Sequence, residues 1–62
     1  MSVGERLRAL RGERTQEEIS KELGITKSSY AMYERGERTP RDEVKVRISK
    51  YYGVSVQELF YS

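Results

Sequence analysis

The sequence predicts an all-α fold of five short helices, and three observations support this fold class. Ser or Thr residues able to cap a helix N-terminus open each of five segments, and glycines close the first four. Within the segments, apolar residues follow the three- and four-residue spacing of a helix face. No run of four or more residues shows the alternation of a strand bounded by turns. Short helices joined by connections of a few residues are therefore expected.

The first two predicted helices each begin with a capping box. Ser2 and Glu5 stand three residues apart, as do Thr15 and Glu18, so each hydroxyl can accept from a helical N–H while the carboxylate reaches back. The first helix is expected to run to about residue 11, and the second ends before Gly24, where a left-handed turn suits glycine. The apolar residues that give these helices a buried face are Val3, Leu7 and Leu10, then Ile19 and Leu23.

The third predicted helix follows the second almost at once. Thr26 can cap it, so the connection spans only about three residues and the two helices must cross at a steep angle. This helix is expected over residues 27–35, with Gly36 ending it. Tyr30 and Tyr33 share one face and are interpreted as core residues.

The last two helices are predicted from the same kinds of signal. Thr39 and Pro40 read as the cap and first-turn proline of a fourth helix, which buries Val44 and Ile48 and ends before residue 53. A third capping box, formed by residues 55 and 58, opens a short fifth helix.

Length and composition bound the function. The 62 residues fit one domain, over residues 1–62, and the absence of Cys and His removes thiol and imidazole catalysis and the usual zinc ligands. We therefore expect no enzyme, no metal and no cofactor. Neither a membrane span nor a signal peptide fits, so a soluble cytoplasmic protein is expected. Because the net charge is only +2, a positively charged surface patch would require basic residues to cluster on one face.

Residues 15–36 carry the most specific motif. Thr-Gln opens it, an apolar and a small residue occupy positions 19 and 20, glycine stands at position 24, and Glu-Arg-Gly closes it. This segment resembles the helix-turn-helix domain of lambda-repressor-like or Cro type, the XRE family of phage and bacterial regulators, and the resemblance continues to Phe60. Two features depart from the family pattern: Ser20 replaces the usual alanine, and the connection over residues 12–14 is shorter.

The resemblance implies binding to double-stranded DNA, with the helix after the turn in the major groove and the helix before it directing its N-terminus at phosphate. The residues expected to face bases are Lys27, Ser28, Ala31 and Met32. Those expected at the DNA backbone are Gln16, Thr26, Ser29, Arg38, Thr39 and Arg41. It also implies that Gly24 makes the bend and that Glu34 pairs with Arg11.

Some of these positions have simpler alternatives. Met32 is either a base contact or partly core, and Glu34 is either the partner of Arg11 or an exposed carboxylate. Three further basic residues are interpreted as solvated helix surface: Lys45, Arg47 and Lys50.

The predicted function is a sequence-specific DNA-binding transcriptional regulator, a bacterial or phage-encoded repressor that binds a two-fold operator as a homodimer. The residues expected at the dimer interface are Val56, Phe60 and Tyr61, because apolar side chains so near the end of the chain otherwise lack cover. The alternative is an antitoxin-like subunit that uses the same fold to bind a protein.

Overall fold

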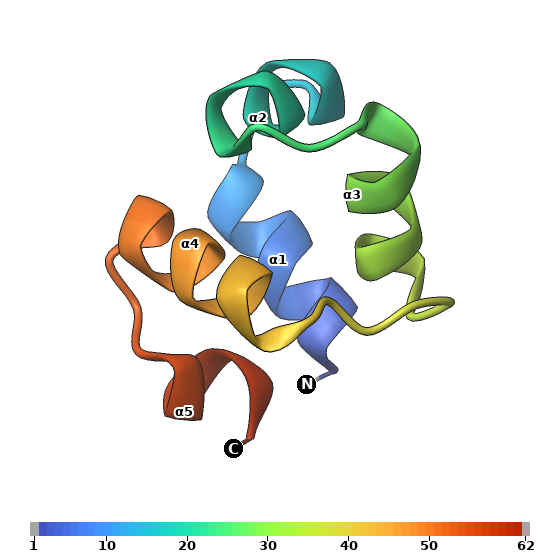
Figure 1. Cartoon of the computed structure of the whole chain (residues 1–62). Helices are drawn as coiled ribbons and strands as arrows, with labels where there is room; N and C mark the ends of the chain where they lie inside the picture. Colours follow the sequence, from blue (N-terminus) through green and yellow to red (C-terminus); the bar gives the residue numbers. More distant parts are fainter. Residues whose placement is uncertain (1, 62) are drawn as a thin grey trace.

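The computed structural model describes residues 2–61 and places five α-helices there. These are α1 (Val3–Arg11), α2 (Gln16–Leu23), α3 (Lys27–Arg35), α4 (Asp42–Tyr52) and α5 (Val56–Phe60). The described part of the chain contains no strand, so the predicted all-α fold class is confirmed. Figure 1 shows α1 in the middle of the molecule, with α2 and α3 on one side and α4 and α5 on the other. None of the helices in residues 2–61 has the length and apolar content needed to cross a membrane.

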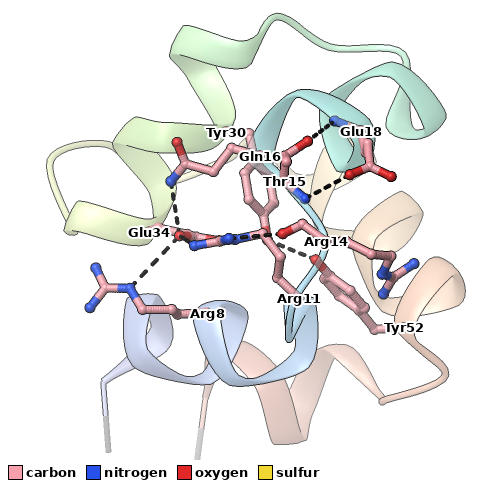
Figure 2. A network of polar contacts seen from close by, with 9 residues as sticks. All are labelled: Arg8, Arg11, Arg14, Thr15, Gln16, Glu18, Tyr30, Glu34 and Tyr52. Atoms are coloured by element: carbon pink, nitrogen blue, oxygen red, sulfur yellow. Dashed lines mark hydrogen bonds and ion pairs between the residues drawn. The ribbon is translucent and has the colours of Figure 1, made fainter.

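The first three helices begin and end where the caps predict. Ser2 and Thr15 each accept a hydrogen bond from the third helical N–H, and the carboxylates of Glu5 and Glu18 accept in return from the cap residues. Figure 2 shows the second of these boxes. Gly24 ends α2 in the left-handed region at φ 74°, which only glycine adopts without strain. Local signals are therefore sufficient to define these three helices.

The fourth helix begins later than predicted. Arg41, and not Thr39, is its N-cap, and Asp42 is its first residue. The predicted first-turn position of Pro40 is wrong, because this proline is buried in the connection and lies outside the helix. Asp42 and Glu43 occupy the first turn instead, where the helix dipole favours negative charge.

The cap of α5 also differs in detail from the predicted box. The Ser55 hydroxyl accepts from the backbone N–H of Glu58 at 3.0 Å and donates to the Glu58 carboxylate at 3.1 Å. The carboxylate thus contacts the cap side chain, and the helix starts at the predicted place.

All five helices contribute to one core. Its buried apolar residues are Leu7, Ile19, Leu23, Tyr30, Tyr33, Val44, Ile48 and Leu59. The interpretation of both α3 tyrosines as core residues is confirmed, and the Tyr30 hydroxyl lies 2.7 Å from that of Tyr52. Burial, followed by the hydrogen bond with Tyr52, raises the pKa of Tyr30. The Ser20 hydroxyl is buried and donates to the carbonyl of Glu17 at 2.9 Å, the kind of partner that burial requires.

Gly4 sets the distance between α1 and α3. It is buried in the first turn of α1, directly against the backbone of Glu34. A Cβ at this position would lie 2.0 Å from the Glu34 carbonyl oxygen, so only glycine fits this contact. Nothing in the local sequence around residue 4 indicates this role, because the contact is between residues far apart in the chain.

A side chain of α4 forms a hydrogen bond with the backbone at the turn between α2 and α3. The Arg47 guanidinium donates to the carbonyl of Leu23, the last residue of α2, at 2.8 Å. This hydrogen bond satisfies a carbonyl left unpaired at a helix C-terminus. Figure 1 shows α2 and α3 steeply inclined to each other across this turn, as the short connection predicts. Arg47 is interpreted from the sequence as solvated helix surface, but its guanidinium also connects α4 to the end of α2.

Candidate nucleic-acid interface

The two helices of the motif border an open hollow of about 420 Å³. It is lined by Gln16 from α2 and by Lys27, Ser28, Ala31, Met32 and Arg35 from α3. The four residues expected to face bases thus meet at one surface, together with one of those expected at phosphate. Arg35 is the additional member. It follows Lys27 and Ala31 at four-residue steps, and this helical spacing was the signal that could have identified it.

The exposed face of α3 has two rows of side chains. Lys27, Ala31 and Arg35 are four residues apart and follow one row, while Ser28 and Met32 form the row beside it. Lys27 and Ser28 are exposed, whereas Ala31 and Met32 are half-buried. Arg35 is exposed as well, so the two ends of this surface are more accessible than its middle.

Two further candidate residues lie at the N-terminus of α3. The Thr26 hydroxyl accepts from the backbone N–H of Ser29 at 3.0 Å and donates to the Ser29 hydroxyl at 2.9 Å. Both hydroxyls are thus part of the helix cap, and Thr26 is exposed beside Lys27.

Residues 36–41, between α3 and α4, carry the other candidate backbone contacts. Arg38 and Thr39 are exposed and line a second hollow, of about 410 Å³, which extends to α1 and α5. Arg41 is exposed at the start of α4, and its guanidinium lies 3.8 Å from the Glu43 carboxylate. None of these three residues lines the hollow beside α3, but Arg35 lines both hollows.

A buried carboxylate lies behind the α3 surface. The Glu34 side chain is 0% exposed and accepts two hydrogen bonds from Arg11, at 2.8 and 3.0 Å. Gln16 donates its amide to the same carboxylate at 3.0 Å, and Arg8 lies 3.8 Å away. Figure 2 shows these side chains of α1 and α2 converging on Glu34, which belongs to α3. The cluster joins α1 to the two helices that border the hollow.

The charge of Glu34 results from opposing effects. Burial raises the pKa of its carboxyl group, but hydrogen bonds from Arg11, Gln16 and Tyr30 together outweigh burial and lower it. The carboxylate is therefore ionised at neutral pH and orients the Gln16 amide. One N–H of that amide is used by Glu34, and an amide nitrogen carries a second.

The C-terminal residues cover part of α4. Lys45 is only 9% exposed, because its ammonium donates to the Tyr61 hydroxyl at 2.6 Å and lies over the rings of Tyr61 and Phe60. The interpretation of Lys45 as solvated surface is wrong for this reason. Val56 and Phe60 are half-buried, whereas Tyr61 remains 58% exposed.

These features define a class of protein. A short helix, a glycine turn and a second helix with an exposed polar face form the helix-turn-helix arrangement by which many proteins bind DNA. The chain matches the family described as Helix-turn-helix over residues 6–59 and belongs to that family. It is accordingly a DNA-binding type of domain.

The chain is also similar to two proteins named as transcriptional regulators. It is 39% identical over 56 residues to the cryptic phage CTXphi transcriptional repressor RstR of Vibrio cholerae. The matched region covers 87% of this chain and 50% of the relative. It is 30% identical over 46 residues to the uncharacterized HTH-type transcriptional regulator MJ0272 of Methanocaldococcus jannaschii, covering 74% of this chain and 70% of the relative. The chain thus spans half the length of the phage repressor it resembles.

Proposed function

We propose that this chain is a cytoplasmic transcriptional regulator, a repressor of phage or mobile-element type, that binds a two-fold operator by placing α3 in the DNA major groove. The observation that carries the proposal is the hollow where Gln16 meets the exposed face of α3. The similarity to a phage transcriptional repressor supports the same function.

The chemistry of the α3 face suits base recognition. Lys27 can donate to guanine O6 and N7, and Ser28 can either donate or accept. Ala31 and Met32 offer apolar atoms to a thymine methyl group. Because only one long cationic side chain lies at the exposed start of the helix, Lys27 is the residue on which base preference should depend most.

Contacts to the DNA backbone are proposed at two places. The second N–H of the Gln16 amide and the N-terminus of α2 can bind one phosphate, beside the hydroxyls of Thr26 and Ser29. The connection before α4 can bind phosphates of another DNA strand, through Arg38, Thr39 and Arg41. These contacts position the domain and carry no base information.

Substitutions at the two kinds of contact should differ in their effects. Lys27→Ala is expected to change the base pair selected from random DNA, at about 1–3 kcal/mol of discrimination. Arg41→Gln should weaken all sequences alike and reduce the slope of log affinity against log salt by about 0.9. Sites selected from random DNA and salt titrations of binding measure both effects.

Lys50→Gln is the matched control, since this exposed lysine of α4 lines neither hollow and its loss changes the net charge equally. Identical behaviour of the Lys27 and Arg41 variants would contradict the division of roles. A shallow salt dependence of the unmodified protein, together with tight binding to a protein partner, would favour the antitoxin-like alternative.

Dimerisation is proposed through the end of the chain, at Val56, Phe60 and Tyr61. The exposed Tyr61 ring is the strongest candidate anchor. Tyr61→Ser should weaken self-association about tenfold or more, whereas Tyr61→Phe, which keeps the ring, should retain it. Sedimentation on a duplex with two half-sites, about 34 Å apart, measures the stoichiometry. A protein that stays monomeric both free and on that duplex would refute the interface.

A further inference from the structure

The C-terminal end of α3 adds a second cation to the surface proposed to face DNA. Arg35 lines the same hollow as Lys27 and follows it on one row of the helix. The helical rise separates the two by about 12 Å along the axis. In the proposed binding mode the N-terminal residues of α3 contact base edges, so Arg35 would lie away from them, toward the phosphates that border the groove.

Glu37 already binds this guanidinium. The Arg35 Nη2 and the Glu37 Oε1 are 3.0 Å apart, and the side chains are 51% and 56% exposed. The backbone N–H of Glu37 donates to the Met32 carbonyl at 3.0 Å, which fixes the carboxylate-bearing residue beside the end of α3. The bond from Arg35 lowers the pKa of Glu37, so this carboxylate is ionised at neutral pH.

A carboxylate and a phosphate compete for the same group. Both offer acceptor oxygens that a guanidinium binds through charge-assisted hydrogen bonds. With Arg35 bonded to Glu37, the Nη2 N–H that the carboxylate accepts is not available to DNA. A phosphate that takes this N–H must therefore displace Glu37.

We propose that Glu37 is an intramolecular competitor of the DNA backbone, which pairs with Arg35 in the free protein and releases it when Arg35 binds a phosphate. This inference rests on the proposed function, binding of duplex DNA through α3. Exposed ion pairs are weak, so the competition reduces affinity without preventing binding. Because phosphate is present at every site, operator and mixed-sequence DNA are weakened alike.

The test is a double-mutant cycle on DNA binding. Glu37→Gln, Arg35→Gln and the double variant are compared with the unmodified chain on a duplex selected from random DNA and on a mixed-sequence duplex. We expect Glu37→Gln to bind both duplexes about two- to fivefold more tightly than the unmodified chain. Its salt slope should be steeper by about 0.9, because one more phosphate charge is neutralised without freeing a carboxylate.

The cycle separates the ion pair from the general repulsion between a carboxylate and DNA. Repulsion acts whether or not Arg35 is present, whereas competition requires it. In the Arg35→Gln background, the change at residue 37 should therefore lose most of its effect on affinity and all of its effect on slope. Glu13→Gln, which removes one exposed carboxylate outside the hollow, controls for net charge.

Each result decides the inference. Equal gains from Glu37→Gln with and without Arg35 overturn it, and so does an unchanged or weaker affinity of the single variant. An unmodified chain that binds neither duplex removes the proposed function itself, and the inference with it. Circular dichroism should show the same unfolding transition for all four proteins, because both side chains are exposed.

Discussion

Gly4→Ala is expected to destabilise the protein strongly, by about 3 kcal/mol or more. Glycine to alanine in a helix ordinarily stabilises by roughly 0.5–1 kcal/mol. Here the added Cβ would lie 2.0 Å from the carbonyl oxygen and 2.8 Å from the carbonyl carbon of Glu34. These are backbone atoms of α3, so no side chain can move aside, and α1 must separate from α3.

The expected loss is large relative to the stability of so small a domain. Overpacking costs about 1–3 kcal/mol, and more where backbone must shift. A single core in a chain of this size rarely supplies more than about 3–5 kcal/mol. Thermal unfolding followed by circular dichroism measures the effect.

Ala9→Gly is the matched control for this helix. Ala9 is exposed on α1, so the reverse exchange should cost only about 0.5–1 kcal/mol through helix propensity. A Gly4→Ala protein with an unchanged or raised melting temperature would show that α1 and α3 tolerate a wider separation than the structure describes.

Glu34→Gln is expected to lose about 3 kcal/mol, because removing one partner of a buried ion pair leaves the other charge uncompensated. Arg11, with 19% of its side chain exposed, is that charge. The amide also offers the Gln16 and Arg11 donors one acceptor in place of a carboxylate. Urea unfolding measures the loss, and Glu17→Gln, at an exposed position of α2, should change stability by less than about 0.5 kcal/mol.

The same carboxylate predicts part of the acid dependence of stability. The pKa of Glu34 is lower in the folded protein than its usual value of 4.5, so its contribution is complete above that value. The contribution is lost as pH falls through the folded pKa. Glu5 and Glu18, whose pKa values are lowered by their cap hydrogen bonds, add to the same trend.

Unfolding free energies measured over the acid range test this assignment. Glu34→Gln should show a shallower decline below pH 4.5 than the unmodified chain, with the cap glutamates and Glu37 supplying the remainder. An osmolyte that strengthens burial keeps the variant folded for the comparison. Parallel curves for the two proteins would mean that the pKa of Glu34 is the same in the folded and unfolded states.

The sequence alone was sufficient to predict the features that depend on residues close together in the chain. Caps and glycines act within about one helical turn, so residues such as Ser2, Thr15 and Gly24 define the helices locally. The motif of residues 15–36 likewise indicated one exposed helix face, and the hollow contains the predicted Lys27 and Gln16.

Only the tertiary structure decided the contacts between residues far apart in the chain. Gly4 needs its lack of a side chain because Glu34 packs on it, and Lys45 is buried because Tyr61 folds over it. Pro40 is buried outside α4, which begins at Asp42 and not where the local signal predicts. Local hydrogen bonds and dihedral preferences determine where helices form, but excluded volume and burial between distant segments determine how closely they pack and which side chains remain free for DNA.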